Sequence, residues 1–357
     1  MSNRATYRLY DDPLKIFSAM LDDIETATQC IYLQTYKFGN DYIGKKFKTA
    51  LLKKAQQGVE INLLLDSWGS GASGEVYFKD LKKAGVEITY FEKIKFSFDL
   101  FSRNHRRNHR KLLLIDDDVS YIGSSNITAH CLNWRECAIK ITGGINKKLR
   151  KIIIDDIDFS NNFFQNKKES TELVKYRNTE IVRDVPSNRF QPVKDKYIEL
   201  INSAQESVVI ETPYFLPDKK LRKSIYIASE RGVKIEIIVP KYSDVLLFDI
   251  LRNKYLGRYY KNNIKMLFYK TDNLHAKVFL VDGNQYLTGS SNFDYRSMRF
   301  MHEINILGSD KSLFSLLQEH IDNTKAECEE FEFEKWKKRH TFQKIVEGLL
   351  VPFRHLF

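Results

Sequence analysis

The sequence predicts an α/β protein of two internally duplicated lobes, each with a mixed central sheet flanked by helices, and an active site at the seam between the lobes. Three observations lead to this fold class. One stretch occurs twice, as HRKLLLIDDDVSYIGSSN from His109 to Asn126 and as HAKVFLVDGNQYLTGSSN from His275 to Asn292. The segments before each copy follow a βαβαβ order. The 357 residues, 43% of them apolar, are enough for two such lobes.

In the first half, an amphipathic helix is expected first, because apolar residues recur at helical spacing over residues 13–28. The strand CIYLQTYKF follows, and then a second helix ends at Gly58, a residue type that commonly follows a helix. VEINLLLD and VEITYF are predicted strands, separated by a helix that ends at Gly85. Strands and helices in this order build a parallel or mixed sheet with helices on its faces.

The second half repeats this order. SVVIETPYF corresponds to the first strand, GVKIEIIVP corresponds to GVEINLLLD, and IKMLFY leads to the second motif. Between the halves, LRKIIIDDIDFSNNFF is predicted to be a helix that closes the first lobe, and NKKESTELVKYRN a linker or surface loop. We therefore expect a first lobe over residues 1–165, a second lobe over residues 166–330, related to it by a pseudo-twofold axis, and an amphipathic segment over residues 331–357.

Each motif begins with a histidine and a lysine two residues apart, so on a strand both side chains point to the same face. In the two copies these residues are His109 with Lys111 and His275 with Lys277. The apolar runs LLLI and VFLV follow as buried strands that end at Asp116 and Asp282. Both aspartates lie at a turn, where we expect them to hold the motif loops by hydrogen bonds.

Each motif ends in a Ser-Ser-Asn loop that brings hydroxyl and amide groups back beside the histidine. These groups belong to Ser124 and Asn126 in the first copy and to Ser290 and Asn292 in the second. A glutamate follows in each copy, at Glu136 and at Glu303, in a strand-like stretch. A carboxylate there can accept a hydrogen bond from one imidazole nitrogen, which fixes the tautomer and leaves the other nitrogen free to attack.

The paired H-x-K and G-S-x-N pattern resembles the phospholipase D superfamily. The run GSSNFDYRSMRFMHEINI after the second histidine, with YLQTYKF and GVEINLLLDSWGS in the first half, is similar to the bacterial cardiolipin synthase branch. A lone HxK pair is more often two polar residues on a strand than a catalytic site. Matched positions repeated in two copies favour the catalytic interpretation, and the resemblance extends over most of the chain.

The expected chemistry is displacement at a phosphodiester. A neutral imidazole can attack phosphorus in line while a protonated imidazole on the opposite side donates to the leaving oxygen. The two lysines, the asparagine amides and the serine hydroxyls can hold the non-bridging oxygens where charge accumulates. With this cationic clamp, and without clustered carboxylates or a His/Cys ligand set in the sequence, we expect neither a metal ion nor a cofactor.

A symmetric motif does not say which histidine attacks. The resemblance implies that His109 is the nucleophile and that His275 is the acid that later becomes the base, with Glu136 and Glu303 orienting them. It also implies a phosphatidyltransferase, which transfers a phosphatidyl group between phosphatidylglycerol molecules through a phosphohistidine to give cardiolipin and glycerol. Two alternatives stay open: a phosphodiesterase that hydrolyses phospholipid or nucleic acid, and a lipid-binding protein with a silent site.

The net charge of +11 indicates an anionic partner but does not choose among nucleic acid, membrane and phosphate-bearing substrate. Two segments favour an anionic phospholipid over nucleic acid. The first, FSFDLFSRNHRRNHRK, reads either as a loop with a solvated basic rim or as a site-entrance loop that dips into lipid; its members are Phe96, Phe98, Leu100, Phe101, Arg103, Arg106, Arg107 and Arg110.

The second segment is the C-terminus, where apolar residues over 342–357 have the spacing of an interfacial helix, beside Trp336 and a basic flank that includes Arg339. A terminal helix docked on the protein's own core has the same pattern. Pro352 should kink or end this helix near Gly348.

The sequence contains no run of 18 apolar residues, no readable export signal and no paired cysteine spacing. We therefore expect a cytoplasmic protein that binds peripherally to the inner face of the cell membrane.

Overall fold

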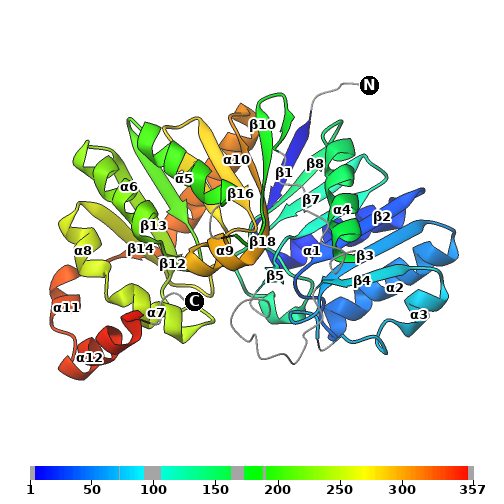
Figure 1. Cartoon of the computed structure of the whole chain (residues 1–357), viewed down its shortest axis with the longest axis horizontal. Helices are drawn as coiled ribbons and strands as arrows, with labels where there is room; N and C mark the ends of the chain where they lie inside the picture. Colours follow the sequence, from blue (N-terminus) through cyan, green and yellow to red (C-terminus); the bar gives the residue numbers. More distant parts are fainter. Residues whose placement is uncertain (1–4, 72, 92–105, 162–172, 188–189, 353–357) are drawn as a thin grey trace.

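The structure, a computed structural model, describes residues 5–71, 73–91, 106–161, 173–187 and 190–352. Figure 1 shows two sheets, each covered by helices, that lie side by side along the longest axis and meet near the middle of the molecule.

The first lobe contains, in its described residues, a seven-stranded sheet in the order β1-β8-β7-β6-β2-β3-β4. Its strands are β1 (Thr6–Tyr10), β2 (Cys30–Thr35), β3 (Glu60–Asp66), β4 (Glu87–Phe91), β6 (Leu112–Ile115), β7 (Val119–Gly123) and β8 (Ala138–Thr142). Its helices are α1 (Pro13–Thr26), α2 (Tyr42–Gln56), α3 (Lys79–Lys83), the 3₁₀ turn η1 (Ala129–Cys131) and α4 (Asn146–Asn161). Aspartates fix two helix starts: Asp12 accepts from the first backbone amides of α1, and Asp41 from those of α2.

The second lobe repeats this layout in the order β19-β14-β13-β11-β15-β16-β18-β10-β9. Its strands are β9 (Val174–Tyr176), β10 (Thr179–Asp184), β11 (Ser207–Glu211), β13 (Lys234–Pro240), β14 (Ile264–Tyr269), β15 (Val278–Val281), β16 (Gln285–Gly289), β18 (Met301–Gly308) and β19 (Cys328–Glu330). Its helices are α5 (Pro192–Ser203), α6 (Lys219–Glu230), α7 (Leu246–Asn253), α8 (Leu256–Lys261), α9 (Tyr295–Phe300), α10 (Lys311–Ala326), α11 (Phe333–Lys337) and α12 (Thr341–Leu350). The short β12 (Phe215–Leu216) pairs with β17 (Phe293–Asp294), and β5 (Arg107–Asn108) pairs with β18.

The predicted duplication is confirmed strand by strand. In each lobe three parallel strands, β2-β3-β4 or β11-β13-β14, continue into four antiparallel ones, β6-β7-β8-β1 or β15-β16-β18-β10. Strands β1 and β10 were not predicted. The prediction of a linker or surface loop over NKKESTELVKYRN was wrong for Val174–Tyr176, which form β9, because a three-residue strand exists only through its pairing with β10.

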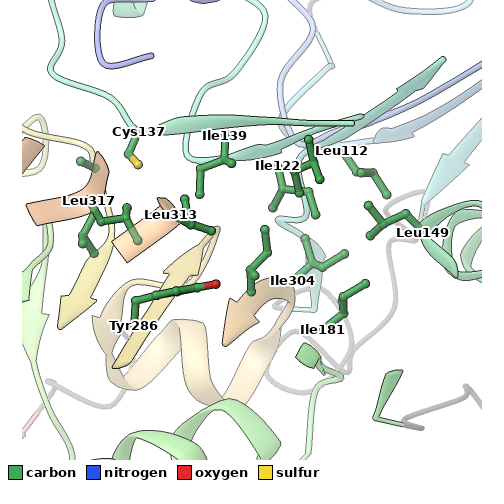
Figure 2. Close-up of a cluster of buried hydrophobic side chains, with 14 of the residues drawn as sticks. Leu112, Ile122, Cys137, Ile139, Leu149, Ile181, Tyr286, Ile304, Leu313 and Leu317 are labelled. Carbon is green, nitrogen blue, oxygen red and sulfur yellow. The ribbon is translucent and has the colours of Figure 1, made fainter. Parts of the chain in front are cut away.

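One hydrophobic cluster crosses the seam. Figure 2 shows Leu112, Ile122 and Ile139 of the first lobe facing Ile304 and Leu313 of the second, and each of these side chains is at most 1% exposed. Full burial of such a side chain contributes about 1.5–3 kcal/mol, so the two lobes share one core rather than touching at a wet surface.

Backbone hydrogen bonds also cross the seam, and they lie next to both motif histidines. His109 N donates to His302 O at 2.9 Å, and His275 N donates to Arg135 O at 2.8 Å. Each histidine is therefore anchored to the opposite lobe through its main chain.

Of the two readings of the Phe-rich loop, the solvated basic rim was wrong for two of its arginines. Arg107 is 2% exposed and lies 3.8 Å from a carboxylate oxygen of Asp66, while Arg110 is 1% exposed and pairs with Asp156 at 2.5 Å. Buried guanidinium groups need such partners, because an unpaired buried charge is costly. The other named parts of that loop, Phe96, Phe98, Leu100, Phe101 and Arg103, lie outside the described residues.

At the C-terminus, α12 runs to Leu350, slightly past the expected end near Gly348. Trp336, expected on a lipid-facing flank, instead packs on Gly257 and donates its indole hydrogen to Asn253 O at 2.9 Å, with the Arg339 guanidinium 3.8 Å above its ring. In the described part of the chain no helix combines the length and apolar character required to span a membrane.

Candidate active site

The two motifs meet at the seam from opposite lobes. His109 precedes β6 and His275 precedes β15, and their side chains are 11% and 6% exposed. They lie close enough that a charge on His275 contributes to lowering the pKa of His109. The two predicted half-sites therefore form one site.

Each histidine is held by a glutamate from the other lobe. His109 Nδ1 lies 3.0 and 3.2 Å from the carboxylate oxygens of Glu303, and His275 Nδ1 lies 3.0 Å from both oxygens of Glu136. Both glutamates are fully buried. With Nδ1 engaged, each imidazole has Nε2 available for chemistry.

The motif serines hold these glutamates. Ser124 Oγ donates to Glu136, and Ser290 Oγ donates to Glu303 at 2.5 Å. A hydroxyl has one proton to donate, and both serines are fully buried. The structure thus gives these hydroxyls a different partner from the phosphoryl oxygens that we expected.

Lys111 and Lys277 lie beside the histidines with little access to solvent. Each ammonium donates to the carbonyl oxygen of its own motif histidine, at 2.8 Å for Lys111 and 2.5 Å for Lys277. Burial lowers the pKa of Lys111 to about 7 and that of Lys277 to about 8, despite the nearby glutamates. An ammonium has three hydrogens, so each lysine keeps donors for an anionic ligand.

The motif asparagines differ in their contacts. Asn126 Oδ1 accepts from Lys37 N at 3.3 Å, whereas Asn292 Oδ1 is buried and has no hydrogen-bond partner among the described residues. Leaving a buried polar atom unpaired costs about 1–3 kcal/mol.

Asp116 and Asp282 lie at the far ends of β6 and β15 and hold loops, as the turn positions led us to expect. Asp116 accepts from the backbone amides of Thr28, Gln29 and Cys30 at 2.6–2.8 Å. Asp282 accepts in the same way from residues 205–207. These contacts tie each motif strand to the start of β2 or β11.

The two histidine–glutamate pairs differ electrostatically. Burial, and then the charges of Lys111 and Lys277, hold the pKa of His109 well below its usual value, and burial raises the pKa of Glu303 to about 7. Burial also lowers the pKa of His275, but Glu136 opposes that shift. Burial would raise the pKa of Glu136, yet the charge and hydrogen bond of His275 keep it below its usual value. The ionised Glu136 carboxylate therefore favours the protonated form of His275.

Sequence reasoning missed several side chains around the histidines. The Tyr36 ring lies 5.4 Å from that of His109, and the Trp134 ring 5.0 Å from that of His275. The charge of Arg296 acts on His109, and the Ser297 hydroxyl bonds to Glu303. Tyr36, Arg296 and Ser297 lie in YLQTYKF and GSSNFDYRSMRFMHEINI, the runs that carry the family resemblance, so their position there was the available signal.

Two duplicated lobes that each bring a histidine and a lysine to one shared seam define a phospholipase D-like enzyme. Residues 20–157 and 197–325 match the family described as "Cardiolipin synthase, PLD-like domain", and the chain belongs to this family.

Proteins of similar sequence agree with this assignment. The chain is 31% identical to a cardiolipin synthase of Clostridium perfringens, over 96% of this chain and 75% of that protein. It is 29% identical to a cardiolipin synthase of a Geobacillus species, over 93% of this chain and 68% of that protein. Its fold resembles the crystal structure of a phosphatidylserine synthase of Haemophilus influenzae, with a TM-score of 0.78, 15% identity and coverage of 98% of this chain and 93% of that one.

Proposed function

We propose that the protein is a phosphatidyltransferase that moves a phosphatidyl group from one phosphatidylglycerol to another, forming cardiolipin and releasing glycerol. The observation that carries this proposal is the pair of glutamate-held histidines at one seam, in a chain similar to proteins named cardiolipin synthase. Such a pair supplies a nucleophile and an acid on opposite sides of phosphorus.

In the first half-reaction, His109 Nε2 attacks the phosphorus of the donor lipid and the bond to the glycerol head group breaks. His275 gives its proton to the leaving oxygen, so the products are phosphatidyl-His109 and glycerol. In the second half-reaction, neutral His275 takes the proton from the acceptor hydroxyl as that oxygen attacks phosphorus. The P–N bond breaks, and its electron pair returns to His109. The lowered pKa of His109, which favours its neutral form, and the ionised partner of His275 support this division of roles.

Lys111 and Lys277, with the amides of Asn126 and Asn292, would hold the non-bridging oxygens during both steps. Ser124 and Ser290 would act indirectly, by fixing the glutamates that orient the histidines. Preorganised donors of this kind stabilise a transition state because they need no rearrangement when charge develops.

Purified protein incubated with head-group-labelled phosphatidylglycerol tests the function. We expect cardiolipin and glycerol in equal amounts. Phosphatidic acid in place of cardiolipin would identify a hydrolase, and cleavage of single- or double-stranded DNA in a parallel incubation would identify a nuclease.

The pH dependence of kcat/KM follows from the buried lysines. Their lowered pKa values mean that the free enzyme loses the charge of the clamp as pH rises through 7 to 8, so kcat/KM should fall over that range. The corresponding fall in kcat should occur at higher pH, because a bound phosphodiester anion favours the charged lysines. Initial rates across pH 6 to 9 measure the pH dependence of kcat/KM and of kcat. A kcat/KM that does not change with pH would contradict the proposed role of the charged lysines.

We also propose that α12 attaches the protein to a membrane surface, at the inner face of the cell membrane. The helix docks on α7 through a polar contact: Glu347 is fully buried and bonds to Asn253 and to Arg339, the latter at 2.9 Å. The opposite face is apolar and turned outward, with Phe342 76%, Ile345 53% and Leu349 67% exposed. A helix that buries its glutamate and exposes its apolar side chains is suited to an interface with lipid.

Replacing Phe342, Ile345 and Leu349 together by serine should reduce binding to anionic phosphatidylglycerol vesicles by more than about tenfold, because the apolar contact with lipid is lost. These side chains are exposed, so folding should be unaffected. Vesicle flotation measures the binding. The matched control is Leu14→Ser with Val76→Ser, which removes exposed apolar side chains from the first lobe. Equal flotation of the triple variant and the wild type would rule out α12 as the anchor.

A further inference from the structure

A cavity of about 350 Å³ lies in the second lobe, outside the paired histidines. It is enclosed by α5, β12, α6, α8 and α9, which lie together on the second-lobe side of the seam in Figure 1. Its floor is apolar and aromatic, with Leu216, Tyr259 and Met298, and its rim is charged.

The charge on this rim is predominantly positive. Its cations are Lys194, Lys219, Lys220, Arg222 and Arg299. The two carboxylates that line the cavity already have partners within the protein. Asp218 caps α6 and pairs with Lys194 at 3.2 Å, and Asp294 caps α9 by accepting from Ser297 N at 2.7 Å. Lys219 and Lys220 are exposed and form no hydrogen bond or ion pair with other side chains in the described part of the chain.

Helix α9 connects this cavity to the catalytic groups. It begins shortly after Asn292 and leads into β18, which carries Glu303. Ser297 of α9 accepts from Asn292 N at 3.3 Å and its hydroxyl bonds to Glu303, while Met298 and Arg299 of the same helix line the cavity. One short helix therefore contacts both the motif and the cavity.

The cavity is also connected to the helix that we propose meets lipid. Leu216 in its floor belongs to a small apolar cluster with Phe248 and Leu251 of α7. Leu350 of α12 packs against this cluster. A series of packing contacts thus leads from α12 through α7 and β12 to the cavity. From the cavity, α9 leads on to Glu303.

The proposed reaction calls for a second phosphate site. The acceptor phosphatidylglycerol carries its own phosphate, which takes no part in the chemistry but stays attached, through the glycerol, to the attacking hydroxyl. Lysine and arginine side chains bind phosphate oxygens by charge-assisted hydrogen bonds. We propose that this cavity binds the phosphate of the acceptor lipid, an inference that rests on the proposed function.

The test compares two acceptors that differ in this phosphate. Phosphatidylglycerol as acceptor gives cardiolipin, whereas labelled glycerol as acceptor gives labelled phosphatidylglycerol from the same phosphatidyl-histidine. Lys219→Gln with Lys220→Gln should lower the ratio of cardiolipin formation to glycerol exchange about tenfold, because charge-assisted contacts to only one acceptor are lost. Glycerol exchange should stay within about twofold of the wild type.

The matched control is Lys45→Gln with Lys46→Gln, an adjacent exposed lysine pair on α2 of the first lobe, which changes the net charge equally and should leave the ratio unchanged. An unchanged ratio in the cavity variant, or an equal fall in both activities, would overturn the inference. A phosphate-induced rise in Tm that only the cavity variant loses, with its ratio unchanged, would instead identify a site for free phosphate and would also overturn it. A wild type that exchanges glycerol but makes no cardiolipin would refute the proposed function itself, and the inference with it.

Discussion

The His109→Ala protein should form no phosphatidyl-enzyme, whereas the His275→Ala protein should form one and accumulate it. With His109 removed, the proposed site has lost the Nε2 that attacks phosphorus. With His275 removed, the leaving group lacks its acid and the acceptor hydroxyl lacks its base. A donor lipid whose leaving group departs without a proton bypasses the first defect but not the second.

The measurement is acid-labile lipid label retained on denatured protein after incubation with such an activated donor. We expect no label on His109→Ala, and more label on His275→Ala than on the wild type at steady state. Replacing His340, an exposed residue outside both motifs, by alanine controls for loss of an imidazole. Label found on His275 in the His109→Ala protein would reverse the assignment. Equal loss of label in both variants would contradict the covalent mechanism.

Replacing either glutamate should impair the histidine that it contacts in the opposite lobe. Glu303→Gln, a change in the second lobe, should impair the first-lobe nucleophile, because a glutamine amide can donate to Nδ1 and move the imidazole proton to Nε2. Glu136→Gln should instead weaken His275 as acid and base. Loss of an orienting carboxylate should lower the rate of the affected step by about 10²–10⁴-fold.

Single-turnover labelling with the activated donor separates the two effects. Glu303→Gln should slow formation of the phosphatidyl-enzyme, whereas Glu136→Gln should leave its formation near normal and slow its transfer to the acceptor. Glu199→Gln, on the exposed side of α5, is the control. The opposite pattern would mean that each glutamate serves the histidine of its own repeat in solution.

Local patterns in the sequence determined the fold class and identified most residues of the active site. Apolar residues at helical spacing predicted α1, because this spacing shows which face of a helix is covered. Short apolar runs closed by turn residues predicted the buried strands β6 and β15. The repeated motif predicted the duplication, and its spacing identified the histidines and lysines that meet at the seam. The turn positions of Asp116 and Asp282 predicted their loop-holding contacts.

What the sequence could not determine depends on how distant segments dock. Strands β1 and β10 form by pairing with β8 and β18, which are distant in the sequence. Arg107 and Arg110 read as solvated until Asp66 and Asp156 are brought beside them. The outward apolar face of α12 depends on the burial of Glu347 against α7.

The pairing of histidines with glutamates is the clearest case. The sequence supplied Glu136 and Glu303 as orienting carboxylates but contained nothing that assigned either to a particular histidine. The shared apolar core and the backbone bonds at His109 and His275 set the lobes so that each carboxylate reaches the imidazole of the other repeat. The residues of the site are therefore local properties of the sequence, whereas their partnerships exist only once the two lobes have packed together.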